Sequence, residues 1–205
     1  MSNPGAGPVR NLALVRRFLP PGAVWAAALF TAPFLNDDGA SALVWGAGSA
    51  VLIALFPWAL VTVLDKRGDL RRGIDRLGAP PVILGGLGAA FVVLRIIRWA
   101  DGPRALAAVV FGMIAAYALT TALSKVARLE WADVTYAADA VVLPVLLYAL
   151  YPGTAGITLA AAAACLCVAG LISSGRKTAG KTVAAAAVGV LAGGGVFLWL
   201  LAYSL

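Results

Sequence analysis

Long apolar runs separated by short polar connections fill most of the chain and predict membrane-spanning helices. The runs have roughly 20 residues each, the length that a helix needs to cross the hydrocarbon core of a bilayer. They are too continuously apolar for barrel strands, in which polar and apolar positions alternate. We therefore expect an all-α, polytopic membrane bundle that forms one transmembrane domain over residues 1–205, with a flexible tail at residues 1–12. The seven predicted spans are Leu19–Leu35, Ala40–Leu64, Pro80–Ala100, Arg104–Leu123, Val134–Tyr151, Thr154–Ser173 and Val183–Tyr203.

The fifth predicted span is the least regular, because Asp139 and Pro144 interrupt its apolar pattern. An ionisable side chain inside a span is costly to bury and is by default a candidate for function. We predict that Asp139 either donates a proton to a substrate or accepts a hydrogen bond that pairs two helices.

The distribution of Lys and Arg predicts the orientation of the spans. Cations concentrate in the N-terminal segment and in the loops after the second, fourth and sixth spans. The opposite side carries Asp37, Asp38 and Asp101 with few cations, and we interpret Arg95 and Arg98 as side chains that reach toward that far interface. Since cytoplasmic loops are the basic ones, we expect a protein of the plasma (inner) membrane with a cytoplasmic N-terminus.

The composition narrows the chemistry further. The chain is 62% hydrophobic, only 12% charged, and contains no histidine. This removes the usual general base and the common haem and zinc ligand, so we predict neither haem nor zinc. Cys165 and Cys167 are two positions apart and point to different helix faces, so we interpret them as small packing residues rather than a metal pair.

The three basic loops predict a phosphate-binding pocket. Guanidinium groups bind phosphate oxygens in a bidentate manner and lysines supply a point charge. The alternative is that these cations only set topology and contact anionic lipids. No nucleic-acid partner is predicted. The candidate phosphate-binding residues are Arg71, Arg72, Arg76, Lys125, Arg176 and Lys181.

The third basic loop also matches the phosphate-loop pattern of nucleotide-binding proteins over Gly175–Thr182. An apolar span precedes it where that motif requires a strand, so we interpret the match as coincidental. The glycines and the following helix start are still favourable to an anion.

Two carboxylates of the first basic loop predict a possible metal site. Asp65 and Asp69 are four residues apart and share a face if the loop is helical, so they could hold Mg²⁺ against a diphosphate. The alternative is a salt-bridged loop, with Asp69 paired to Arg72 or Arg76. Asp69 and Asp139 are the candidate catalytic residues.

Small and aromatic residues predict how the helices pack. Ala185, Gly189 and Gly193 form a small-residue stripe that favours close packing within the chain or, alternatively, a homo-oligomer seam. The tryptophans near predicted span ends are expected to form interfacial belts; they are Trp25, Trp99, Trp131 and Trp199.

The arrangement of the polar loops resembles the small actinobacterial branch of the type 2 phosphatidic acid phosphatase superfamily. Ser174 and Lys181 occupy the Ser and His positions of the third motif, with Gly175 where the family has Arg and Ala185 where it has a polar or acidic residue. Lys125–Leu129 resembles the second motif, and Lys66–Arg76 stands in place of the first. The resemblance implies a lipid-phosphatase-like core. Because the family acts through a phosphohistidine, it also implies phosphate binding without that chemistry.

A second resemblance is to the UbiA superfamily of intramembrane prenyltransferases. Asp65, Asp69 and Asp75 lie in the loop after the second span, where that family has its first aspartate-rich motif, although no carboxylate follows the sixth span. Both families act on isoprenoid or lipid (di)phosphates, so such a molecule is the expected partner. The expected chemistry is diphosphate departure or acid-initiated terpene cyclisation. The alternative is a non-catalytic lipid-binding, scaffold or transporter-subunit protein.

Overall fold

The computed structural model describes residues 19–57, 59, 81–127, 129–173 and 179–204, and their regular structure is helical. The all-α prediction is therefore confirmed for this part of the chain. In order, the elements are α2 (Pro21–Thr31), η1 (Ala32–Leu35), α3 (Gly39–Ser49), the π-helical η2 (Ala50–Leu55), α6 (Pro81–Trp99), α7 (Arg104–Ala127), α8 (Trp131–Leu150), α9 (Thr154–Ile172), α10 (Ala179–Val188), the π-helical η3 (Gly189–Gly194) and α11 (Gly195–Ser204).

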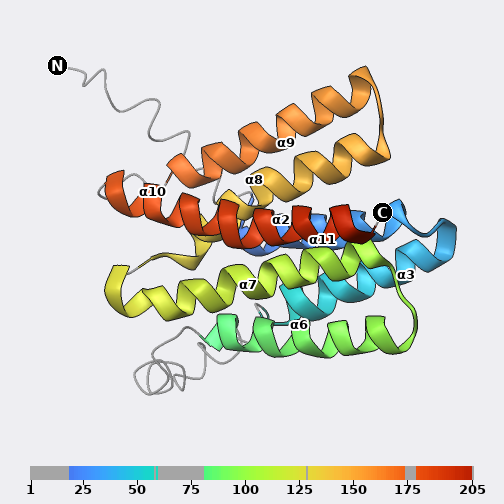
Figure 1. The fold of residues 1–205 in the computed structure, drawn as a ribbon, viewed down its shortest axis with the longest axis horizontal. Helices are drawn as coiled ribbons and strands as arrows, with labels where there is room; N and C mark the ends of the chain where they lie inside the picture. Colours follow the sequence, from blue (N-terminus) through green and yellow to red (C-terminus); the bar gives the residue numbers. More distant parts are fainter. Residues whose placement is uncertain (1–18, 58, 60–80, 128, 174–178, 205) are drawn as a thin grey trace.

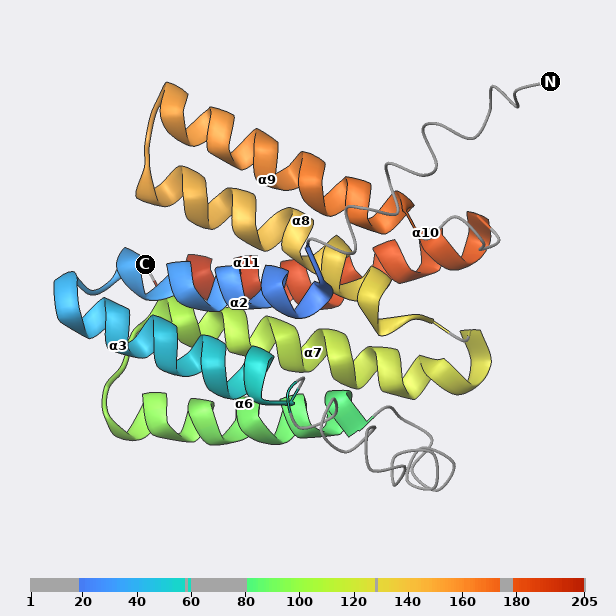
Figure 2. The same cartoon turned by 180° about the vertical axis from the view of Figure 1, so that it is seen from behind.

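The helices pack side by side with alternating direction (Figures 1 and 2). The α2–α3, α6–α7 and α8–α9 connections lie at one end of the bundle, together with the C-terminal end of α11. We call this the α6–α7 end. The end of α7 and the starts of α8 and α10 lie opposite, at what we call the α7–α8 end.

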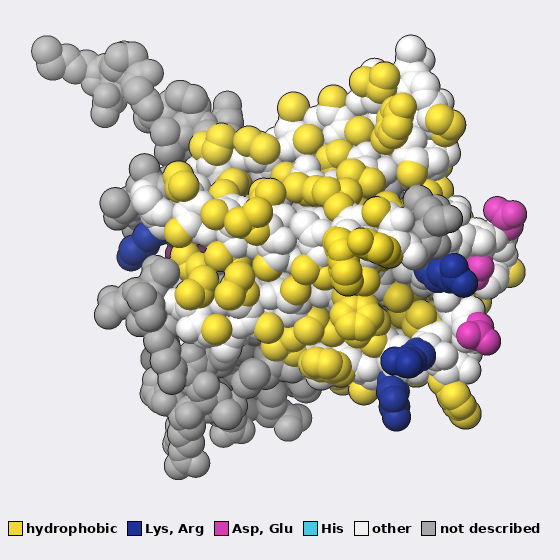
Figure 3. All heavy atoms as spheres, in the orientation of Figure 1, with side chains coloured by type: hydrophobic (Ala, Val, Ile, Leu, Met, Phe, Trp, Pro, Cys, Tyr) yellow, Lys and Arg dark blue, Asp and Glu magenta, His cyan; other side chains and the backbone are white. Residues whose placement is uncertain are grey.

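Four helical stretches are long and apolar enough to cross a membrane. Shorter apolar helices cover Pro21–Leu35 and Gly39–Ala54, and α6 is not among the four stretches found in the described residues. Hydrophobic side chains cover the middle of the face drawn in Figure 3, and charged side chains gather at the α6–α7 end. The membrane class is thus supported, whereas seven spans stay a prediction. The four stretches are Arg104–Leu123, Trp131–Leu150, Thr154–Ile172 and Gly180–Tyr203.

The central helix is α8, which contacts α2, α7, α9, α10 and η3. It runs without a break from Trp131 to Leu150, although the sequence pattern is interrupted at Asp139 and Pro144. Neighbouring helices on several sides stabilise it where its own pattern is weak, since most helical stability in proteins comes from packing. Asp139 is consequently held in regular helix at the middle of the bundle.

The small-residue stripe packs against α8 of the same chain. Ala185 is buried, and an added Cβ at Gly189 would lie 2.4 Å from the Val134 carbonyl oxygen. An added Cβ at Gly193 would lie 2.6 Å from the Cβ of Ala138. The stripe is therefore used for packing within the chain. A homo-oligomer stays a prediction, and the surface of Gly189 and Gly193 is already covered by α8.

One tryptophan departs from the predicted interfacial belts. Trp99, the last residue of α6, and Trp199, within α11, are exposed, but Trp25 is only 1% exposed. It lies inside the bundle because its indole N–H has a polar partner there, as described below.

The glycine contact gives a direct test of the packing between η3 and α8. Gly193→Ala adds one methyl group against Ala138 and should lower the free energy of unfolding by about 1–3 kcal/mol, the usual cost of overpacking. Gly88→Ala is the matched control, because nothing lies within 4 Å of an added Cβ at that position of α6. Unfolding of both variants in detergent micelles would be compared with the parent, and equal stability would contradict the packing described here.

Candidate functional site

A buried polar cluster joins α2 and α8 near the α7–α8 end. The indole Nε1 of Trp25 donates a hydrogen bond to Oγ1 of Thr135 at 3.3 Å. The Thr135 hydroxyl in turn donates to the carbonyl oxygen of Trp131 at 2.9 Å, one turn back along α8. Such back-bonding satisfies a threonine hydroxyl inside a helix without another side chain. Trp25 and Thr135 are thereby paired across the helix interface with both polar groups satisfied.

Asp139 lies one turn beyond Thr135 and is fully buried. Neither of its carboxylate oxygens has a hydrogen-bond partner among the described residues. Its electrostatic neighbours are Tyr117 of α7 and Cys167 of α9. An ionised carboxylate here would lose its hydration and gain no hydrogen bond from the described residues in return. The environment therefore favours the neutral acid.

A cavity of about 180 Å³ lies beside this cluster. Its wall is mostly apolar and aromatic. Two of its aromatic residues, Trp25 and Tyr117, also interact with Thr135 of the polar cluster. Since Pro20 and Pro21 precede or open α2 and Trp131 opens α8, the cavity lies toward the α7–α8 end. The lining residues are Pro20, Pro21, Gly22, Trp25, Ile53, Ala54, Gly86, Met113, Tyr117 and Trp131.

Tyr117 connects the cavity to Asp139. It lines the cavity, and its phenol interacts with the side chains of Thr135 and Trp25 and electrostatically with Asp139. Its ring meets that of Trp25 edge to face, with centroids 6.3 Å apart and planes at 69°. Asp139 itself does not line the cavity. No hydrogen bond joins Asp139 to Tyr117 among the described residues, so the interaction between them is electrostatic.

Two π-helical segments border this region. In η2, Ile53 and Ala54 line the cavity. In η3, Gly189 and Gly193 pack on the turns of α8 that precede Asp139. A π-helical turn is rare and often marks a functional site, because it shifts side chains out of regular helical register.

Most of the predicted phosphate-binding and metal-binding residues lie outside the described residues. Lys181 is described, near the start of α10, with an exposed side chain at the α7–α8 end. Lys125 lies in the last turn of α7, which ends on the same side of the bundle. The proposed convergence of the three basic loops stays a prediction. The residues outside the described part are Asp65, Asp69, Arg71, Arg72, Arg76 and Arg176.

No cluster of three or more potential metal ligands occurs among the described residues. The predicted Mg²⁺ site depends on Asp65 and Asp69 and is therefore not tested. Cys165 is exposed whereas Cys167 is buried, which agrees with the interpretation that they point to different faces.

Sequence reasoning found Asp139 but missed its surroundings. Thr135 lies four residues before Asp139 and Trp131 four residues before Thr135, so a single polar face of α8 is visible in the sequence. Trp25 and Tyr117 carry no comparable signal, because only the packing of α2 and α7 on α8 brings them to that face.

No family model, curated protein or solved structure matches the chain. The resemblances to the lipid phosphatases and to the UbiA superfamily accordingly stay predictions that rest on the motifs alone.

The pairing of Trp25 with Thr135 predicts a specific loss of stability. Thr135→Val keeps the side-chain shape but leaves the buried indole N–H without its acceptor, which should cost about 1–3 kcal/mol. Thr158→Val is the control, because the Thr158 hydroxyl is exposed and donates to the carbonyl oxygen of Ala155 in its own helix. Unfolding free energies of the two variants in the same micelles would be compared. A Thr135→Val protein as stable as the control would contradict the role of this hydrogen bond.

Proposed function

We propose that this is a membrane-embedded protein that binds an isoprenoid or lipid (di)phosphate at the α7–α8 end of the bundle. The supporting observation is the aromatic cavity of about 180 Å³ beside Asp139, which is buried and has no hydrogen-bond partner among the described residues. In this proposal the start of the apolar chain enters the cavity and the phosphate stays outside, among the cations of the basic loops.

The lining of the cavity suits an unsaturated hydrocarbon chain. Its aliphatic residues exclude water, and three aromatic side chains, from Trp25, Tyr117 and Trp131, contribute to the wall. Aromatic faces favour contact with apolar groups and stabilise a developing positive charge. These properties match an isoprenoid in its ground state and also a carbocation derived from it.

The phosphate would bind where the basic loops begin and end. Lys181 is exposed at this end, and Lys125 lies in the last turn of α7 on the same side. The remaining proposed contacts are Arg71, Arg72, Arg76 and Arg176. Mg²⁺ held by Asp65 and Asp69 would assist if the reaction begins with departure of the diphosphate.

The buried acid supports an alternative first step. A neutral Asp139, once it is hydrogen-bonded to Tyr117, would transfer a proton through the Tyr117 hydroxyl to one carbon of a double bond, and the other carbon would become a tertiary carbocation. The π-electrons of a second double bond then close the ring. Loss of a proton from the cyclic cation back through Tyr117 restores Asp139. The sum is an isomerisation that consumes no other reagent.

A second candidate is lipid-phosphate binding without conversion. It is favoured by the position of Asp139, which does not line the cavity and has no hydrogen-bond partner among the described residues. Under this proposal Asp139 and its neighbours shape the bundle, and the protein serves as a lipid carrier, scaffold or transporter subunit.

The proposed setting is a plasma (inner) membrane crossed by seven spans, with the N-terminus and basic loops in the cytoplasm. This is supported by the alternating direction of the helices and by the excess of Lys and Arg in the loops of one side.

The first test of this proposal is binding, measured as thermal stabilisation by farnesyl and geranylgeranyl diphosphate with and without Mg²⁺. A ligand at about 100 times its dissociation constant should stabilise the native protein by about 2.7 kcal/mol. Gly86→Phe should abolish the shift, because an added Cβ at Gly86 would lie 3.8 Å from the Ile53 carbonyl oxygen and 4.0 Å from the Tyr117 ring, so that the new side chain fills the cavity.

Gly88→Phe is the matched control on the same helix, since its Cβ position meets nothing within 4 Å. It should keep the full shift. Absence of any shift in the parent protein, or equal shifts in both variants, would refute binding in this cavity. A shift that requires Mg²⁺ would favour departure of the diphosphate over proton transfer.

The second test separates conversion from binding. Asp139→Asn preserves size but cannot supply the proton, so it should keep the thermal shift and lose product formation by at least about a hundredfold, the scale of a general acid. Tyr117→Phe should likewise keep binding and slow conversion. Products would be followed by gas chromatography after phosphatase treatment. Binding without product in the parent protein would instead establish the non-catalytic candidate.

A further inference from the structure

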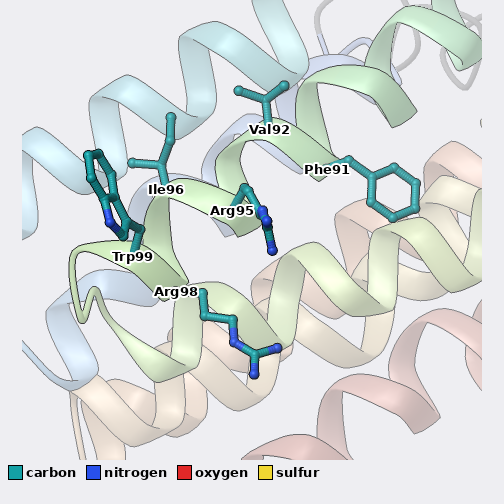
Figure 4. Close-up of a pocket in the computed structure, with 6 residues that line it drawn as sticks. All are labelled: Phe91, Val92, Arg95, Ile96, Arg98 and Trp99. Carbon is teal, nitrogen blue, oxygen red and sulfur yellow. The ribbon is translucent and has the colours of Figure 1, made fainter.

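A second lipid-facing site lies at the α6–α7 end, away from the cavity. Two open depressions, of about 810 and 650 Å³, share Phe91, Arg95 and Arg98. The larger also includes Val92, Ile96 and Trp99 on the outer face of α6 (Figure 4). The smaller is a groove between α6 and α7 whose further lining comes from Leu94, Ile97, Asp101, Gly102, Arg104, Ala107 and Phe111.

Two cations of this surface, Arg95 and Arg98, are available to a ligand. Arg95 and Arg98 are exposed, and neither forms a salt bridge with a described carboxylate. Figure 4 shows their side chains extending to the same side of α6. Arg104 and Asp101 stand at the rim of the groove, so its charged lining has three arginines and one aspartate. The surface is therefore positive in net charge.

Apolar residues continue from the arginines toward the middle of the bundle. Phe91 is 60% exposed and Phe111 48% exposed, one on each side of the groove. Trp99, 91% exposed, is the last residue of α6, where an indole would lie at the level of the lipid headgroups. The inner face of α6 is packed into the bundle through Ala90, Val93 and Ile97. The exposed face thus pairs a cationic rim with an apolar groove.

We propose that this groove binds an anionic phospholipid of the adjacent leaflet, with its phosphate on Arg95 and Arg98 and an acyl chain between Phe91 and Phe111. Guanidinium groups bind phosphate oxygens in a bidentate manner, and two of them three residues apart on one helix face can share a single phosphate. A soluble anion would use the arginines alone, whereas a membrane lipid uses the apolar groove as well. The site is independent of the cavity at the opposite end.

The experiment is native mass spectrometry of the full chain in detergent, titrated with phosphatidylglycerol, phosphatidylcholine or glycerol phosphate. Phosphatidylglycerol should bind with a defined stoichiometry and at least about tenfold more tightly than either other ligand, because the positive surface repels the choline cation of phosphatidylcholine and glycerol phosphate has no acyl chain to bury in the groove. Arg95→Gln and Arg98→Gln should each weaken it by roughly tenfold. Phe111→Ser should weaken the lipid but leave the weak binding of glycerol phosphate unchanged.

Leu191→Gln is the control for placing a glutamine on the exposed apolar surface, because Leu191 of η3 is 72% exposed and lines neither the groove nor the cavity. It should leave phosphatidylglycerol binding at this site unaltered. All four substituted side chains are exposed, and melting temperatures without added lipid would verify that each variant is folded. Equal weakening by Leu191→Gln, equal binding of phosphatidylcholine, or equally tight binding of glycerol phosphate would overturn the proposal.

Discussion

The close approach of η3 to α8 is the contact on which the rest of the bundle depends. Gly189 and Gly193 carry only hydrogens where any side chain would collide with Val134 or Ala138. In a lipid environment apolar helices gain little from hiding apolar surface, so association rests on close packing of small residues. This contact holds the last helical stretch against α8. With α9 and α2 on its other sides, α8 becomes the enclosed centre of the fold.

That enclosure also explains why the polar residues of α8 differ so much from one another. Thr135 is satisfied by its own helix and by Trp25, so it costs the fold little. Asp139 has no hydrogen-bond partner among the described residues, and a leucine or methionine there would be cheaper to bury. A group that the fold accommodates only at a cost is better explained by a task than by packing. This reasoning favours a role for Asp139 in function over a role in stability.

The sequence predicted the helices better than the site, for a physical reason. Continuous apolar runs determine that a segment is helical in a membrane, and the last four predicted ranges coincide closely with helices long enough to cross one. The burial of Trp25 and the continuity of α8 across Pro144 depend on neighbours distant in sequence. The π-helical turns of η2 and η3 have no local sequence signal either. Most predicted phosphate contacts fall in loops outside the described residues, so their convergence stays a prediction.

The same helix, α7, contributes to both proposed sites but with different faces and different turns. Ala107 and Phe111 border the outer groove near its start, whereas Met113 and Tyr117 border the cavity further along. Gly112 lies between these pairs, and an added Cβ there would be 2.6 Å from the Gly193 carbonyl oxygen. The helix is therefore anchored to η3 between the two sites. Substitutions in the groove should leave the cavity in place, so each proposal can fail without the other.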